Sequence, residues 1–256
     1  MNQTLQKLHD IKKNGYQLDF GDVFNHAFEN YKKIAVYAGA VLVIFTFIYF
    51  IFFGVTLVSV LGLSTIAEEF TPEKLKLGQF SSTLLFKIGC VTVFISTLFS
   101  PFLASFLKMA EHGEKDKNFP VSSLFEFYKP PYFKEIIFST FLILTINLAQ
   151  TTLMNYLKLE LLGNFIYYFI SFTTILTIPL IVFGNLLAFD AIKYSIILVC
   201  KQPIILLGLM IVAIIGVFVG VLGCCVGIFF TIPILYSMNY AIYDAIIGIE
   251  RSEENN

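Results

Sequence analysis

Residues 203–249 read PIILLGLMIVAIIGVFVGVLGCCVGIFFTIPILYSMNYAIYDAIIGI. As a single α-helix this apolar run of 47 residues would be about 70 Å long, whereas a bilayer core is about 30 Å thick. Three glycines cluster in its middle, within Gly220–Gly227. Since glycine favours turns, the run predicts two membrane spans, Pro203–Leu222 and Val226–Ile247, joined by a tight hairpin.

The composition of the whole chain agrees with a membrane protein. Of its 256 residues, 57% are hydrophobic and 14% are charged, whereas a soluble domain has about 45–50% apolar and about 25% charged residues. A soluble fold of this length could not bury so many apolar side chains. We therefore expect an all-α polytopic membrane protein with six transmembrane helices, the first four being Ile34–Leu63, Leu84–Leu107, Ile136–Leu157 and Phe165–Phe189.

The distribution of basic residues predicts the orientation of the chain. If both ends lie on one side of the membrane, that side carries thirteen basic residues and the other side only four, namely Lys74, Lys76, Lys87 and Lys158. The positive-inside rule then places both termini in the cytoplasm, as polar tails of residues 1–17 and 250–256 around a single transmembrane domain of residues 18–249.

An amphipathic segment precedes every second span, and each predicts a helix lying at the membrane interface. These segments are Leu18–Lys33, Val121–Lys129 and Asp190–Lys201. Each one, with the two spans that follow it, predicts one of three repeat units, which cover about residues 18–112, 119–189 and 190–249. All three begin and end on the cytoplasmic side, so they are parallel repeats, unlike the inverted repeats of many transporters.

The return helix of each predicted hairpin carries a proline in mid-span, where we expect a kink; these are Pro101, Pro179 and Pro233. A proline leaves one backbone carbonyl without its usual N–H donor, and within lipid that carbonyl needs another partner. A hydroxyl group lies within two residues before each proline, and we expect these hydroxyls to supply the donor: Ser100, Thr177 and Thr231.

Polar residues recur at matching positions after the last two prolines. Asn185 and Asn239 follow six residues later, and Asp190 and Asp244 follow eleven residues later. Since a carboxylate in a membrane is costly, Asp190 and Asp244 are candidate functional carboxylates at the interface. The alternative is a structural role at helix ends.

A second set of candidates consists of amides. Asn147, Gln150 and Thr151 lie on one face of the third span, where they line a polar cavity or join helices by hydrogen bonds worth about 0.6 kcal/mol each. The cavity interpretation requires Asn147 and Gln150 to converge with Asn185 and Asn239.

Common catalytic and metal-binding patterns are missing from the sequence. It contains no Walker loop, Gly-x-Ser-x-Gly elbow or His-Glu-x-x-His helix, and its neighbouring cysteines, Cys224 and Cys225, lack the Cys-x-x-Cys spacing. We therefore expect no metal and no cofactor. The net charge of −1 does not favour nucleic acid; the expected partners are membrane lipids and, as a further option, other membrane proteins.

Three stretches near the end of the chain, Asp190–Ser195 (DAIKYS), Gly223–Pro233 (GCCVGIFFTIP) and Tyr243–Gly248 (YDAIIG), resemble a family of bacterial multipass membrane proteins. The resemblance covers most of the chain and is carried by the N-terminal interfacial segment and the last two spans. The family includes the membrane domain attached to some glycerophosphodiester phosphodiesterases, and it implies a location in the bacterial inner membrane. No phosphodiesterase domain is present. Some relatives carry a carotene-oxygenase label, which the three histidines of this chain do not support.

These observations favour a non-enzymatic inner-membrane protein, either a scaffold or an accessory subunit of a membrane assembly. The alternative is a carrier or binder of a lipid or small amphiphile, through a cavity between the hairpins. A membrane-embedded enzyme is the weakest of the three hypotheses, because no acid, base or nucleophile set has a recognisable spacing.

Overall fold

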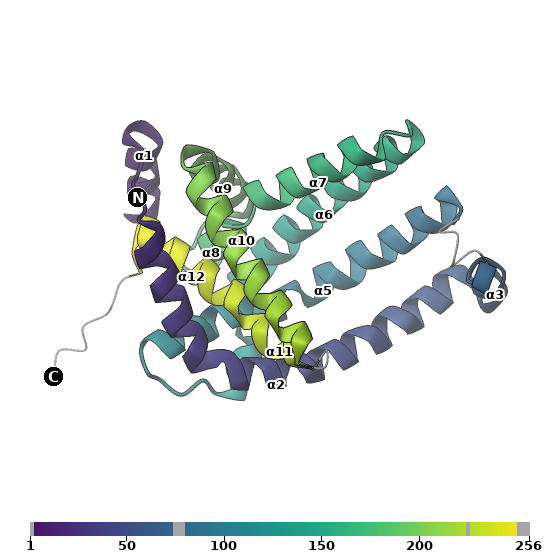
Figure 1. Cartoon of the computed structure of the whole chain (residues 1–256). Helices are drawn as coiled ribbons and strands as arrows, with labels where there is room; N and C mark the ends of the chain where they lie inside the picture. The colour runs from purple at the N-terminus through teal and green to yellow at the C-terminus, as the bar shows by residue number, and fades with distance from the viewer. Residues whose placement is uncertain (1–2, 74–79, 224–225, 250–256) are drawn as a thin grey trace. The chain divides into compact units, whose positions relative to one another are not determined.

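The structure is a computed structural model that describes residues 3–73, 80–223 and 226–249. Every regular element in these ranges is helical, which confirms the all-α prediction for the described chain (Figure 1). The elements are α1 (Gln3–Asn14), α2 (Phe20–Leu61), α3 (Leu63–Glu69), α5 (Ser82–Glu114), the 3-10 helix η1 (Val121–Tyr128), α6 (Tyr132–Tyr156), α7 (Glu160–Thr173), α8 (Thr177–Val182), α9 (Ala188–Lys201), α10 (Pro203–Val219), the 3-10 turn η2 (Gly220–Leu222), α11 (Gly227–Thr231) and α12 (Pro233–Ile247).

Five helical segments are long and apolar enough to cross a membrane, as a multipass membrane protein requires. They are α2, α5, α6, the segment Glu160–Val182 that contains α7 and α8, and the segment Pro203–Leu222 that contains α10 and η2. The last of these has the same bounds as the predicted fifth span. The predicted sixth span, Val226–Ile247, consists of α11 and α12, which are separated at Ile232 because Pro233 lacks an N–H.

The three predicted interfacial segments are helical, but they differ from one another. Asp190–Lys201 lies within α9, which is separated from α10 by Gln202 and Pro203. Val121–Lys129 forms the 3-10 helix η1 rather than an α-helix. Leu18–Lys33 is not a separate helix, since α2 continues from it into the first span; α2 contains no proline, and its glycines do not interrupt the helix.

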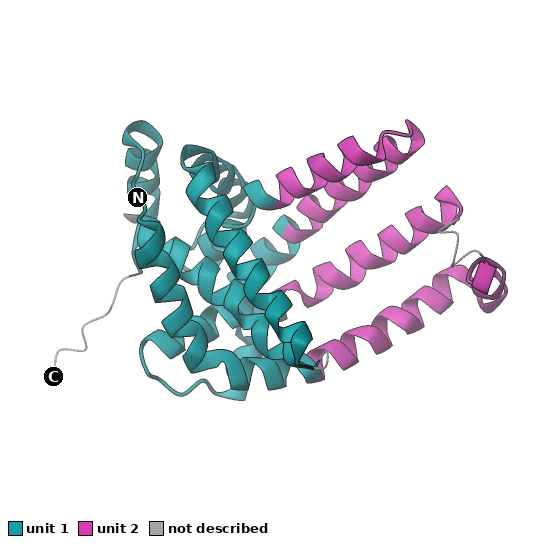
Figure 2. Ribbon diagram, viewed as in Figure 1, with its two compact units in different colours: residues 1–43, 101–139, 172–256 teal, residues 44–100, 140–171 magenta. Residues whose placement is uncertain are grey.

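The chain is divided into two compact units (Figure 2), although the sequence analysis treats residues 18–249 as one domain. Unit 1 contains residues 1–43, 101–139 and 172–256, and unit 2 contains residues 44–100 and 140–171. Four long helices, α2, α5, α6 and α7, contribute residues to both units.

Unit 1 contains a continuous hydrophobic core. Leu176, Leu180, Leu198 and Leu206, from the α8, α9 and α10 region, are fully buried within it, together with Met238 of α12. Burying one such leucine side chain stabilises a fold by about 1.5–3 kcal/mol in water. This core is what holds the first and last segments of the chain in one unit.

The N-terminal segment, predicted as a polar tail, contains a helix that packs against other helices of unit 1. Residues 3–14 form α1, whose Leu5, Leu8 and Ile11 have the three-residue spacing of one helix face. Leu8 is fully buried, and α1 packs against α9 and α12. The polar residues of α1 obscure this stripe when the segment is judged by composition alone.

Two hydrogen bonds fasten the chain just after α1. The Tyr16 hydroxyl donates to the Leu198 carbonyl at 2.8 Å, and the Gln202 amide donates to the Tyr16 carbonyl. Burial raises the pKa of the Tyr16 hydroxyl well above its ordinary value, so this group stays neutral and remains a donor. The connection between α1 and α2 is therefore fixed to the C-terminal part of α9.

Unit 2 combines close helix contacts with a broadly exposed apolar surface. A Cβ added at Gly89 of α5 would lie 2.3 Å from Leu148 of α6, so these two helices approach closely there. The Tyr49 and Ser96 hydroxyls are hydrogen-bonded at 3.1 Å. On α2, Phe47 is 70% exposed, which is the surface expected of a helix that contacts lipid.

The three mid-span prolines lie in different surroundings. Pro101 lies inside the continuous helix α5, and it has no backbone N–H to donate to the Thr97 carbonyl. The Ser100 hydroxyl donates to this carbonyl instead, at 2.8 Å. This is the arrangement expected from the sequence.

The other two prolines depart from that arrangement. Pro179 lies in the short helix α8, and the buried hydroxyl of Thr177 has no hydrogen-bond partner among the described residues. Near Pro233, the Thr231 hydroxyl donates at 3.0 Å to the Val217 carbonyl of α10. This hydroxyl joins two helices instead of serving the carbonyl that Pro233 leaves without a donor.

Candidate functional site

A polar cavity of about 420 Å³ lies within unit 1, and we call it the lysine cavity. Four segments that are far apart in sequence line it: α1, the C-terminal part of α5, the end of α8 with the turn after it, and the end of α12. Its lining residues are Thr4, Lys7, Lys108, Glu111, Val182, Phe183, Asn185, Tyr243, Ile247, Gly248 and Ile249. Its volume lies within the range of about 300–1,000 Å³ that is typical of small-ligand pockets.

Helix α1 contributes a cation to this cavity. Lys7 Nζ donates to the Ile247 carbonyl at 2.9 Å, and that carbonyl belongs to the last residue of α12. A lysine at a helix C-terminus is favourable because the terminal carbonyls carry partial negative charge. Since an ammonium group has three donors, Lys7 keeps donor capacity beyond this bond.

The second cation of the cavity belongs to a compact charge cluster at the C-terminal end of α5, where Lys115 directly follows the helix. Lys108 Nζ and Lys115 Nζ each lie 2.6 Å from one carboxylate oxygen of Glu111, whose side chain is 9% exposed. The pairs are three and four residues apart, which places all three side chains on one helix face. Two positive charges therefore share one negative charge, and the cluster carries a net charge of +1.

Asn185 is the one predicted amide that lines the lysine cavity. It has a φ of 50°, in the left-handed region, and ends a tight turn after α8. A Cβ added at the preceding residue, Gly184, would lie 2.5 Å from the Leu180 carbonyl oxygen, so only glycine fits there. The Gly-Asn pair thus holds Asn185 at the edge of the cavity by backbone geometry.

The other three predicted amides lie elsewhere. Asn147 and Gln150 belong to α6 in unit 2, where Asn147 is 4% exposed and the Gln150 amide donates to the Gly163 carbonyl at 3.2 Å. Asn239 belongs to α12 in unit 1, and its side-chain oxygen is buried without a hydrogen-bond partner among the described residues. Convergence of the four amides on one cavity therefore stays a prediction.

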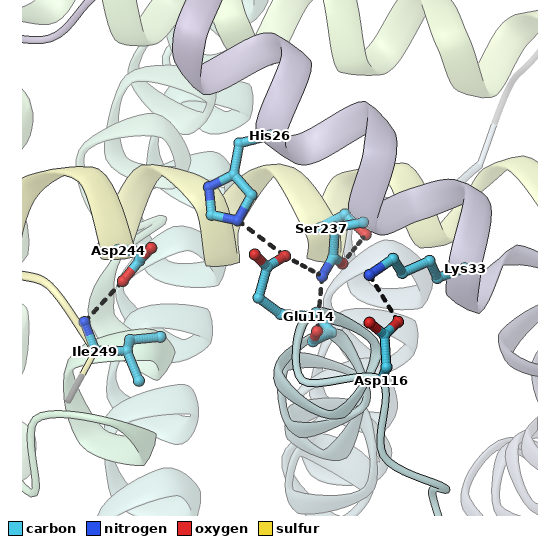
Figure 3. Close-up of polar contacts among 9 residues, drawn as sticks. His26, Lys33, Glu114, Asp116, Ser237, Asp244 and Ile249 are labelled. Atoms are coloured by element: carbon cyan, nitrogen blue, oxygen red, sulfur yellow. Dashed lines mark hydrogen bonds and ion pairs between the residues drawn. The ribbon is translucent and has the colours of Figure 1, made fainter. Parts of the chain in front are cut away.

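The two candidate carboxylates occupy helix ends. Asp244 Oδ1 accepts a hydrogen bond of 2.7 Å from the Ile249 backbone N–H, beyond the end of α12 (Figure 3). Asp190 lies in the first turn of α9, where a negative charge complements the helix dipole. Both positions agree with the structural alternative given in the sequence analysis.

The start of α9 has a further cap that sequence reasoning missed. Glu135, from the first turn of α6, accepts a hydrogen bond of 2.8 Å from the backbone N–H of Ala188. The partners are 53 residues apart, so local sequence gives no signal for this contact.

A buried polar network lies beside the charge cluster and joins α2, α5 and α12 (Figure 3). The Asn30 amide donates to the Ala110 carbonyl at 2.7 Å, while its oxygen accepts from the Ser237 hydroxyl at 2.9 Å. His26 Nε2 lies 3.1 Å from Glu114 Oε2. The two hydrogen bonds of Asn30 satisfy buried groups and fix the mutual position of the three helices within unit 1.

Sequence reasoning missed most of the cavity residues, including Lys7, Lys108 and Tyr243. Two local signals were available: the apolar spacing in residues 5–11, which predicts a helix carrying Lys7, and the spacing of Lys108, Glu111 and Lys115. Contact between these segments depends on the tertiary fold, and periodicity does not reveal it.

Within the ranges that the structure describes, no group of three His, Cys, Asp or Glu side chains is placed to hold a metal ion. Beside the Glu111 carboxylate, the cavity presents two ammonium groups, an amide and hydroxyls, which together can bind an anion through charge-assisted hydrogen bonds. Comparisons of the chain with known protein families, with curated proteins and with solved structures find no match.

Proposed function

We propose that this chain is a multipass protein of the bacterial inner membrane, with both termini in the cytoplasm, that serves as a scaffold or accessory subunit of a membrane assembly. The observation that carries this proposal is a set of long-range hydrogen bonds that join the first and last segments of unit 1. Lys7 is bonded to Ile247, Tyr16 to Leu198 and Tyr31 to Phe230.

The bonds of Lys7 and Tyr16 support a scaffold because both join segments that are predicted to lie on the cytoplasmic side, and they give that face a fixed shape. Each joins residues more than 180 positions apart, so the first and last segments of the chain form one preorganised surface. A preformed surface binds a partner with a smaller entropic cost than a flexible one does.

Helix α9 provides the part of this surface best suited to lateral contact. Its buried face packs into the core of unit 1 through residues such as Tyr194 and Leu198. On the other face Phe189, Lys193 and Ile196 are exposed at spacings of four and three residues. An apolar stripe that includes a lysine is typical of a helix at a membrane interface or beside a membrane partner.

Photo-cross-linking from α9 tests the scaffold proposal. A photoreactive residue in place of Phe189 or Ile196 is expected to give a discrete protein adduct in intact membranes. When the protein is extracted from the membrane into lipid nanodiscs, we expect it to be bound to its partner in a fixed stoichiometry. A photoreactive residue at Lys13, an exposed position on α1, is the control. A monomer that forms only lipid adducts from α9 would contradict the proposal.

The lysine cavity favours a second candidate function, a binder or carrier of a lipid or small amphiphile. The cavity combines cationic groups with apolar side chains such as Val182, Phe183 and Ile249. Binding without transport is tested by native mass spectrometry of the purified chain. Transport further requires the four predicted amides to be accessible to water. If the chain is a carrier, cysteines that replace Asn147 and Asn239 should both react with a hydrophilic maleimide. Failure of both cysteines to react would exclude a carrier.

A further inference from the structure

We propose that the lysine cavity binds a phosphate group, with Lys7 and Lys108 as its cationic ligands. This inference rests on the second candidate function and names the chemistry of the group that is bound. The same chemistry fits the phosphate of a phospholipid headgroup and a free phosphate, and the experiment below distinguishes these two sources.

The charge around the cavity favours an anion. Lys7 and Lys108 line it, and Glu111 is the one acidic side chain among its lining residues. Glu111 is paired on its other oxygen with Lys115, so its charge is shared between two lysines and does not neutralise the cavity. Lys7 donates to the neutral Ile247 carbonyl, and among the described residues it forms no ion pair with a carboxylate. The cavity therefore holds an excess of positive charge.

The donor groups favour phosphate among anions. Two ammonium groups from different helices can approach separate oxygens of one phosphate, each as a point charge with free donors. Lysine is an established phosphate ligand in this manner. The amide of Asn185, held at the cavity edge by the turn after α8, adds a neutral donor.

The predicted position of the cavity at the membrane interface favours a phospholipid as the molecule that supplies the phosphate group. Lys7 and Lys108 both belong to the set of basic residues that the sequence assigns to the cytoplasmic side. Phospholipid phosphates lie at the depth where such lysines meet the membrane interface. The apolar lining residues Val182, Phe183 and Ile249 could contact the glycerol and first acyl carbons of a lipid.

Helix α1 gives the test a matched pair of lysines. Lys7 lines the cavity, whereas Lys13 is on the same helix, exposed and outside the cavity. Lys7→Gln removes the charge but keeps an N–H that can donate to the Ile247 carbonyl, so it separates anion binding from the helix-capping bond. Lys7→Arg keeps the charge, and Lys13→Gln makes the same change in net charge away from the cavity.

The full-length chain is purified in detergent, freed of lipid and titrated with three probes: dioctanoyl phosphatidic acid, dioctanoylglycerol and inorganic phosphate. We expect phosphatidic acid to bind more tightly than dioctanoylglycerol. Lys7→Gln should weaken its binding by about tenfold or more, as expected for loss of one charge-assisted hydrogen bond, while Lys7→Arg and Lys13→Gln stay within about twofold of the natural chain. Thermal unfolding of each variant verifies that the fold is retained.

The outcomes separate the two proposals. If inorganic phosphate binds as tightly as phosphatidic acid, with the same dependence on Lys7, the phosphate site is supported and its source is a free phosphate. If dioctanoylglycerol binds as tightly as phosphatidic acid, or if Lys7→Gln and Lys13→Gln have equal effects, the phosphate inference is overturned and lipid binding stands. If none of the probes binds, both the inference and the second candidate function are overturned.

Discussion

Asn30 of α2 is completely buried, and its side-chain amide is hydrogen-bonded to groups on both α5 and α12. It donates to the Ala110 carbonyl of α5 and accepts from the Ser237 hydroxyl of α12, while its own backbone belongs to α2. In a buried site the loss of this amide leaves both partners without their hydrogen bonds, which costs more than the bonds themselves contribute.

We therefore expect Asn30→Ala to destabilise the protein by about 2–4 kcal/mol, through unpaired polar groups and the cavity left behind. Ser237→Ala removes only one hydroxyl and should cost about 1 kcal/mol. Unfolding in mixed micelles by increasing denaturing detergent measures both changes. Equal effects of the two variants would show that the amide does not hold the three helices together.

Ser100 supplies a hydroxyl where Pro101 has removed a backbone donor. We expect Ser100→Ala to cost about 1 kcal/mol, because the Thr97 carbonyl then lacks both donors. Pro101→Ala restores a backbone N–H, so the same serine substitution in that background should cost measurably less, and a double-mutant cycle gives the coupling.

A matched control for Ser100 lies on the same helix. The Thr92 hydroxyl donates to the Ile88 carbonyl at 2.9 Å, where the regular backbone donor is intact. Thr92→Ala should therefore have a smaller effect on unfolding than Ser100→Ala. Equal costs would mean that the proline has no part in the role of Ser100.

At the scale of helices, two glycines of α2 have opposite surroundings. A Cβ at Gly39 would lie 2.4 Å from the ring of Phe230 on α11 and 3.0 Å from its Cα, so α2 and α11 approach closely at this point. A Cβ at Gly54 would meet nothing within 4 Å. One glycine is required by packing, and the other is not.

The variants Gly39→Ala and Gly54→Ala test this difference in the same helix. Gly39→Ala should destabilise the protein by about 1–3 kcal/mol, because the added methyl group forces α2 away from α11. Gly54→Ala should be neutral or stabilising by about 0.5–1 kcal/mol, because alanine favours the helix. The change in unfolding midpoint is the measurement, and a loss of stability in Gly54→Ala would contradict the prediction.

For the whole molecule, the decisive prediction is the orientation of the connections between spans. With cysteine-free protein as background, Lys158→Cys, between α6 and α7, should react with a membrane-impermeant maleimide on intact cells. Lys117→Cys, between α5 and η1, should react only after the cells are permeabilised. The physical basis is the lysine bias between the two sides. The reverse labelling pattern would invert the topology, and with it the proposed cytoplasmic position of the lysine cavity.

The sequence predicts those structural features that are determined by residues close together in the chain. The helical segment Pro203–Leu222 has the bounds predicted for the fifth span, because the length and hydropathy of one continuous segment determine them. The role of Ser100 follows from the neighbouring proline. Both are effects within one segment.

The lysine cavity and the polar network around Asn30 could not be predicted in this way, because they are formed by segments far apart in the sequence. Lys7 lies among polar residues at one end of the chain, and its partner Ile247 lies 240 residues away. Asn30 is one of several polar residues on an amphipathic segment, and its burial depends on α5 and α12. Contacts of this kind are created by tertiary packing and leave no periodic pattern in the sequence.

The docking of α1 against α9 and α12 has a consequence for biosynthesis. Helix α1 is synthesised before the helices that it packs against, so its native position becomes available only after α9 and α12 have been made. At about 5–20 residues per second, this delay is on the order of 10–50 s. During that time the apolar stripe of Leu5, Leu8 and Ile11 has not yet met the helices that cover it in the folded protein.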